Sequence, residues 1–127
     1  MKALVIDDSK AIRSIICKHL KALGFDVVEA DSGVDALVKL KKMGGADIAL
    51  LDWNMPEMDG FEFLRRVRGD QEFSNLLVMM VTTESEMTQV AKALEAGANE
   101  YLMKPFTKEA LSEKLVLLGL DTGEAAA

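Results

Sequence analysis

The sequence predicts an α/β protein in which five strands alternate with five helices. Short continuous apolar runs, such as residues 76–81, are typical of strands that are covered on both faces. Between these runs lie segments whose apolar residues recur at helical spacing. Regular alternation of this kind produces right-handed crossovers, which build a parallel sheet between two layers of helices.

The first strand is predicted at residues 3–6, an apolar run that ends at Asp7. Ser9 follows in a position to cap a helix, because its hydroxyl can accept a hydrogen bond from a free N–H group of the first turn. Gly24 ends this helix. The apolar positions within it follow helical spacing: Ile12, Ile15, Ile16, Leu20 and Leu23.

The second and third units repeat this order. Residues 25–30 form the second strand, and residues 32–43 form a helix that begins at a serine and ends at a glycine pair. The apolar run at residues 48–51 predicts the third strand. The third helix is predicted to begin at residues 59–60, where Asp59 can act as a helix cap, and to continue through Arg68.

The fourth strand is the apolar run at residues 76–81, and a helical stripe follows it up to Gly97: Met87, Val90, Ala91 and Leu94. The fifth strand is predicted at residues 99–103. Thr107 then caps a last helix with one apolar face: Leu111, Leu115 and Leu118.

Charged residues stand at the ends of three of these strands. Asp7 and Asp8 follow the first strand, Asp52 follows the third, and Lys104 follows the fifth. Because parallel strands end at the same edge of a sheet, these side chains are expected to converge where open α/β sheets bind their ligands. Clustered carboxylates repel one another, with a cost of roughly 4 kcal/mol for two unit charges about 4 Å apart at an effective dielectric near 20. The cluster therefore indicates a functional site.

Composition restricts the partners. A net charge of −6 and a pI near 4.8 argue against nucleic acid or an anionic membrane, and favour cations. No apolar run has the length of a membrane span or a secretion signal, so we expect a cytoplasmic protein. The single cysteine, Cys17, is expected to be a packed and inert thiol. Residues 1–120 are expected to form one domain, followed by a frayed tail at residues 121–127.

Several motifs together resemble the receiver domain of two-component response regulators. They occur in the expected order along nearly the whole chain: Asp7-Asp8, the DWNMPEMDG block at residues 52–60, Thr82, Tyr101 and Lys104-Pro105. The resemblance implies a flavodoxin-like, doubly wound fold with the strand order 2-1-3-4-5, an order that is a standard example for this family.

The resemblance also implies a role for each site residue. Asp52 would accept a phosphoryl group from a phosphohistidine of a kinase or phosphotransfer protein. Asp7, Asp8 and Asp52, with the main-chain carbonyl of Asn54, would hold Mg²⁺, for which Mn²⁺ could substitute. Lys104 would neutralise a phosphoryl oxygen.

The resemblance further implies a conformational switch. Thr82 would turn its hydroxyl toward the phosphoryl group and Tyr101 would move inward, which would change the surface of the fourth helix, fifth strand and fifth helix. The bond between Lys104 and Pro105 is expected to be cis. Three neighbouring residues are expected to modulate the reaction: Trp53, Thr83 and Glu84. Thr83 stands where the family usually has a smaller residue, and it is expected to slow self-dephosphorylation.

We therefore expect a monomeric, phosphorylation-activated signalling switch and not an enzyme with an external substrate. The segments at residues 52–56 and 82–84 look like those of chemotaxis regulators that act on the flagellar switch. A phosphorelay intermediate, a phosphate sink and a receiver cut from a longer regulator remain open alternatives.

Two other classes of protein compete with this interpretation. A flavin-binding protein of similar fold would need a Ser/Thr-rich phosphate loop after the first strand, where this chain has Asp7-Asp8-Ser9. A phosphatase with an aspartyl nucleophile would need a second carboxylate two residues after Asp52, and that position is Asn54. Flavin absorbance and turnover of a phosphate ester would distinguish these classes.

Overall fold

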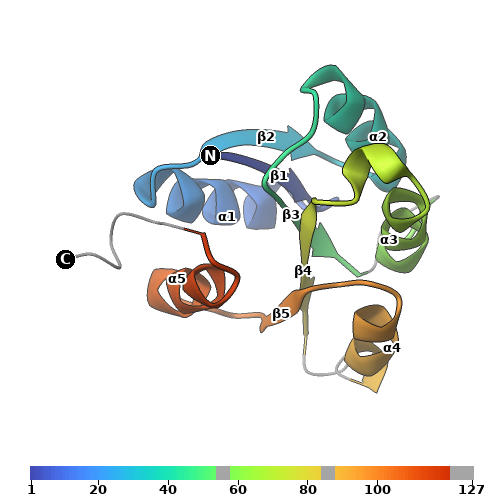
Figure 1. The fold of residues 1–127 in the computed structure, drawn as a ribbon. Coiled ribbons are helices and arrows are strands. Elements are labelled where there is room, and N and C mark those ends of the chain that lie inside the picture. The colour runs from blue at the N-terminus through green and yellow to red at the C-terminus, as the bar shows by residue number, and fades with distance from the viewer. Residues whose placement is uncertain (54–57, 84–87, 121–127) are drawn as a thin grey trace.

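A computed structural model describes residues 1–53, 58–83 and 88–120 of the chain. Within these residues, five parallel strands form one sheet in the order β2-β1-β3-β4-β5, with helices on both faces (Figure 1). The predicted α/β class and strand order are confirmed. The strands are β1 (Lys2–Ile6), β2 (Asp26–Ala30), β3 (Ile48–Asp52), β4 (Leu77–Thr82) and β5 (Glu100–Met103).

The helices follow the strands as predicted, and four of them begin at the expected caps. They are α1 (Lys10–Ala22), α2 (Gly33–Lys42), α3 (Gly60–Arg68), α4 (Val90–Glu95) and α5 (Lys108–Leu117). A short 3-10 helix, η1 (Gln71–Phe73), was not predicted. Side-chain oxygens accept hydrogen bonds from backbone N–H groups of the first turn at four caps: Ser9, Ser32, Asp59 and Thr107.

Alternate residues of the strands build two separate hydrophobic cores. In β1, Leu4 and Ile6 face the core beneath α2, α3 and α4, whereas Ala3 and Val5 face the core beneath α1 and α5. All four are at most 1% exposed. The sheet is therefore covered on both faces, as the continuous apolar runs predicted.

The buried faces of two helices differ from the prediction. Ile15 of α1 is 50% exposed, because the core contacts of that helix fall on its other apolar positions. In α4, Ala91 and Leu94 are exposed, while Val90 and Ala93 are buried. Apolar residues lie at both i, i+3 pairs of this short helix, so periodicity alone did not identify the packed face. Met87 lies outside the described residues.

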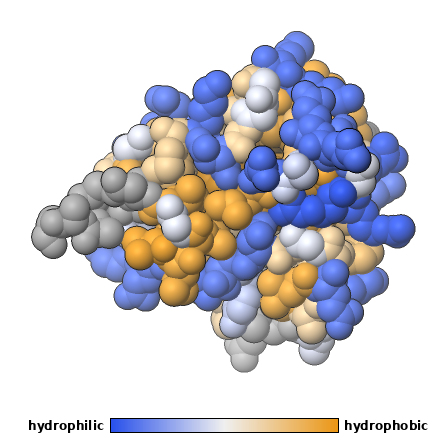
Figure 2. Space-filling view, viewed as in Figure 1, coloured by the Kyte–Doolittle hydropathy of each residue, from blue (hydrophilic) through white to orange (hydrophobic). Residues whose placement is uncertain are grey.

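Cys17 is buried, and burial raises the pKa of its thiol to about 11, so it is unreactive, as expected. Among the described residues, none of the helices is long and apolar enough to cross a membrane. Apolar side chains gather beside α5 in the space-filling view (Figure 2), where Val116 and Leu117 are exposed.

Candidate functional site

The candidate site lies at the carboxyl edge of the sheet, where neighbouring strands end side by side. Ile6 pairs with Leu51 across β1 and β3, so Asp7 and Asp52 are the next residues on adjacent strands. Asp52 is the last residue of β3, and Lys104 directly follows β5. The register therefore brings together residues that lie almost a hundred positions apart in the sequence.

Lys104 joins the two buried carboxylates. Its Nζ atom lies 3.3 Å from Oδ2 of Asp7 and 3.3 Å from Oδ1 of Asp52. Asp7 is 1% exposed and Asp52 is 7% exposed. Ion pairs this far from solvent are screened weakly, so each charge strongly affects the others.

The third predicted carboxylate, Asp8, completes a cluster that suits a hard cation. Asp7, Asp8 and Asp52 each offer an oxygen atom within 4.8 Å of the others, and Asp8 is exposed to solvent. Carboxylate oxygens are the ligands that Mg²⁺ and Mn²⁺ prefer. The three carboxylates and the Lys104 ammonium carry a net formal charge of −2, which one divalent cation would balance. The donor set thus fits the expected metal.

Lys104 offsets only part of what raises the pKa of Asp52. Burial and the negative charge of Asp7 raise the pKa of Asp52 to about 6, although the Lys104 ammonium acts in the opposite direction. Burial tends to lower the pKa of Lys104, but the charges of Asp52 and Asp7 outweigh it and raise that pKa. Lys104 therefore stays charged, and Asp52 is ionised at neutral pH at a cost in stability.

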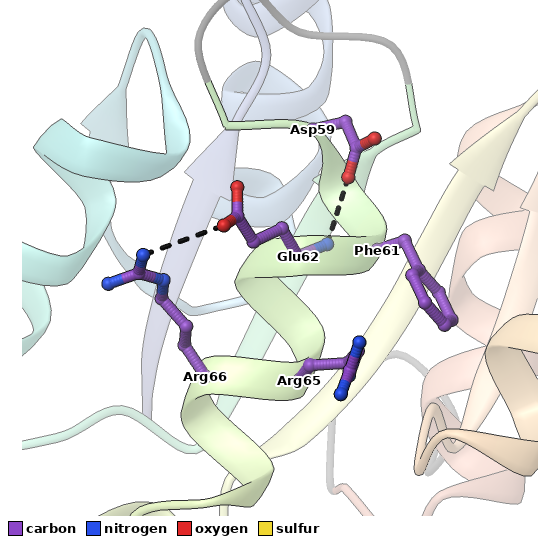
Figure 3. Close-up of a pocket in the computed structure, with 5 residues that line it drawn as sticks. All are labelled: Asp59, Phe61, Glu62, Arg65 and Arg66. Carbon is purple, nitrogen blue, oxygen red and sulfur yellow. Dashed lines mark hydrogen bonds and ion pairs between the residues drawn. The ribbon is translucent and has the colours of Figure 1, made fainter.

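The start of α3 lies close to the end of β3. The backbone N–H of Gly60 donates to the carbonyl of Trp53 at 3.0 Å, and a Cβ atom at Gly60 would overlap the Asp52 carbonyl oxygen. Asp59 accepts a hydrogen bond from the N–H of Glu62 at 2.9 Å (Figure 3). This close approach explains why the block needs a glycine directly after its capping aspartate.

Trp53 is 7% exposed and packs against the aromatic ring of Phe61, with 6.0 Å between ring centroids. Figure 3 shows Arg65 of α3 on the same side of the helix as Phe61, and its guanidinium carbon lies 6.0 Å from the centroid of the Phe61 ring. Nζ of Lys92 lies 4.4 Å from the same centroid. The residue after Asp52 is thus connected to α4 through two ring contacts.

The predicted switch residues lie on the two strands that follow β3 in the sheet, Thr82 on β4 and Tyr101 on β5. Thr82, at the end of β4, is 1% exposed, and its hydroxyl donates to the carbonyl of Thr83 at 3.2 Å. Tyr101 is half-buried against the core beneath α4, and Nζ of Lys114 lies 4.5 Å from its ring centroid. Thr83 is also half-buried.

The structure describes only some of the remaining predicted features. The Lys104–Pro105 peptide bond is cis, as the resemblance implied. Asn54 and Glu84 lie outside the described residues, as does the tail at residues 121–127. Sequence reasoning missed Arg13, whose guanidinium donates to the Asp7 carbonyl at 2.7 Å. An arginine within an amphipathic helix carries no signal that separates this contact from an ordinary solvated position.

Comparisons with known proteins agree with this geometry. A family model described as the response regulator receiver domain matches residues 3–116. The chain is 46% identical to a chemotaxis protein CheY homolog of Campylobacter jejuni over 129 residues, which cover 100% of this chain and 99% of that protein. It is also 46% identical to chemotaxis protein CheY1 of Helicobacter pylori, covering 94% and 98% of the two chains. The solved structure of Vibrio cholerae chemotaxis protein CheY4 superposes with a TM-score of 0.84 at 35% identity, over 91% of this chain and 96% of that chain.

Proposed function

This chain belongs to the response regulator receiver family, and from that membership we propose that it is a chemotaxis signalling switch activated by phosphorylation of Asp52. The observation that carries the proposal is the buried contact of Lys104 with Asp52 and Asp7 at the carboxyl edge of the sheet. Relatives named as chemotaxis proteins match over nearly their whole length, which supports the signalling context.

In the proposed reaction, Asp52 is the nucleophile. One of its carboxylate oxygens attacks the phosphorus of a phosphohistidine on a histidine kinase or a phosphotransfer protein. The O–P bond to Asp52 forms as the P–N bond breaks, and the departing imidazole nitrogen takes up a proton from solvent. Lys104, whose Nζ lies 3.3 Å from Asp52, is placed to stabilise the negative charge of the phosphoryl oxygens.

Asp7, Asp8 and Asp52 would hold Mg²⁺, or Mn²⁺ in its place, together with the main-chain carbonyl of Asn54. Bound there, the cation supplies positive charge that neutralises the phosphoryl oxygens. The three carboxylates with Lys104 carry a net charge of −2, so they would repel a phosphodonor if they were not neutralised.

The output would be a change in protein binding. Once Asp52 is phosphorylated, Thr82 turns its hydroxyl from the Thr83 carbonyl to the phosphoryl group, and Tyr101 moves inward behind it. The surface of α4, β5 and α5 then binds a target protein of the flagellar motor. We place this monomer in the cytoplasm, with residues 1–120 as its one receiver domain. Its catalysis is confined to its own phosphorylation and dephosphorylation.

Labelling with acetyl phosphate tests the proposal. Wild-type protein in Mg²⁺ should form a phosphorylated product that survives acid and breaks down in base, and Asp52→Asn should abolish it. Asp59→Asn is a matched control, because it makes the same chemical change at a helix cap where asparagine also serves. Equal labelling of Asp52→Asn and wild type would disprove the assignment of the nucleophile.

A further inference from the structure

Among the described residues, Arg13 forms hydrogen bonds with the main chain of Asp7 and with Glu29, and not with a predicted ligand side chain or the nucleophile. Its Nη1 atom donates to the main-chain carbonyl of Asp7 at 2.7 Å, and its Nε atom donates to the carboxylate of Glu29 at 3.1 Å. The Arg13 side chain is only 15% exposed. A guanidinium that engages two acceptors at once holds them in a fixed geometry, which a lysine ammonium cannot reproduce.

The carbonyl that Arg13 holds belongs to the peptide that joins Asp7 to Asp8. The orientation of that peptide sets where the backbone of Asp8 begins. Asp8 is exposed, so its carboxylate depends on the backbone for its place in the cluster. Three other bonds hold Asp7 itself. Its N–H donates to the carbonyl of Ala30 at 3.2 Å, its Oδ1 accepts from the N–H of Ser9 at 2.8 Å, and its Oδ2 accepts from Nζ of Lys104 at 3.3 Å.

Glu29, which carries the second acceptor of Arg13, is held through its main chain. The main-chain carbonyl of Glu29 accepts a hydrogen bond from Nζ of Lys39 at 2.6 Å, and Lys39 forms an ion pair with Asp35 at 3.1 Å. Glu29 lies in β2, Arg13 in α1 and Lys39 in α2. The guanidinium therefore connects the turn after β1 to a residue of β2 whose main chain is also held from α2.

We propose that Arg13 is a positioning residue for the cation site, which fixes the Asp7–Asp8 peptide so that the Asp8 carboxylate meets those of Asp7 and Asp52. This inference rests on the proposed function, because it concerns the same divalent cation. Groups that orient metal ligands from outside the coordination sphere typically change metal affinity 10- to 100-fold when they are removed.

The positive charge of Arg13 makes the direction of the change in Mg²⁺ affinity informative. Arg13 is a cation near a cation site, so Coulomb's law alone predicts that its neutralisation would strengthen Mg²⁺ binding. A purely structural role predicts lower stability with unchanged affinity in the folded protein. Only a positioning role predicts weaker binding when the positive charge is removed.

The experiment is isothermal titration calorimetry of Mg²⁺ into wild type, Arg13→Gln and Arg13→Lys, with urea unfolding of each variant. We expect Arg13→Gln to raise the Mg²⁺ dissociation constant roughly tenfold. Arg13→Lys should raise it less, because an ammonium reaches one of the two acceptors at a time. Arg66→Gln is the matched control, since Arg66 is 57% exposed and its ion pair with Glu62 is at the surface of α3.

The outcomes separate this inference from the proposal beneath it. If wild type binds no Mg²⁺, or if Asp8→Ala leaves binding unchanged, the proposed cation site is wrong. If wild type binds and Arg13→Gln binds equally or more tightly, only the positioning role is refuted. Should Arg13→Gln fail to fold, Arg13→Lys decides, and wild-type affinity in that variant would overturn the inference.

Discussion

Replacement of Asp52 by asparagine should stabilise the protein when no metal is present. Asp52 is 7% exposed, and burial together with the charge of Asp7 raises its pKa to about 6, from an ordinary value of 3.8. The ionised side chain is therefore less stable in the folded protein than in the unfolded chain. Asparagine has nearly the same shape and carries no charge, so it removes this penalty.

The size and the pH dependence of the effect follow from the two pKa values. A shift of about two units corresponds to about 3 kcal/mol. Because the folded-state pKa is the higher one, the folded protein binds the extra proton, and its stability falls as pH rises from about 3.8 through about 6. The gain from Asp52→Asn should be about 3 kcal/mol at pH 7.5, roughly half of that at pH 5, and close to zero below pH 3.8.

Urea unfolding with a metal chelator, at pH 5 and pH 7.5, measures this gain. Asp59→Asn serves as the control, since that carboxylate caps α3 and asparagine can accept the same hydrogen bond. We expect it to change stability little at either pH. A variant at Asp52 that is no more stable than wild type at pH 7.5, or whose gain does not shrink at pH 5, would refute the argument.

Three further predictions concern the metal, the switch and the lifetime of the phosphorylated state. Mg²⁺ should change the fluorescence of Trp53 saturably, and Asp8→Ala should weaken the titration; identical curves would remove Asp8 from the site. Thr82→Ala should still be labelled by acetyl phosphate but should lose most of the increase in partner affinity that phosphorylation gives. If partner binding by this variant still depends fully on phosphorylation, Thr82 has only a packing role. Thr83→Ala should lose its phosphoryl group faster than wild type, because a smaller side chain opens the path of the attacking water; an equal or slower decay contradicts this.

Most of the fold could be predicted because local signals and packing agree. Ser9, Ser32, Asp59 and Thr107 each mark a helix start that the structure confirms. These residues act within one turn of the chain, so their effect can be deduced from the sequence nearby. The convergence of Asp7, Asp52 and Lys104 also followed, because parallel strands present their carboxyl ends at one edge.

What could not be predicted depends on contacts between distant elements. In α4, the sequence allows two apolar faces, and in the structure Val90 and Ala93 are the buried residues. Arg13 gives no local signal, because its acceptors lie in β2 and in the turn after β1. The same is true of Arg68, whose Nη2 donates to the side-chain oxygen of Asn99 at 2.8 Å. Such long side chains acquire a structural role only once the elements are assembled.

At the acidic cluster, unlike in the two hydrophobic cores, the residues present reduce stability. One ammonium, that of Lys104, lies equally far from Asp7 and Asp52. Its charge does not offset the combined effect of burial and of the Asp7 charge, which together raise the pKa of Asp52. Substituting a neutral residue would relieve the repulsion without disturbing either core, since both cores are built from other positions. A sheet edge shaped for stability alone would therefore not contain these acids. Conflicts of this kind are expected at functional sites, and here the conflict would be resolved when a divalent cation balances the negative charge of the cluster.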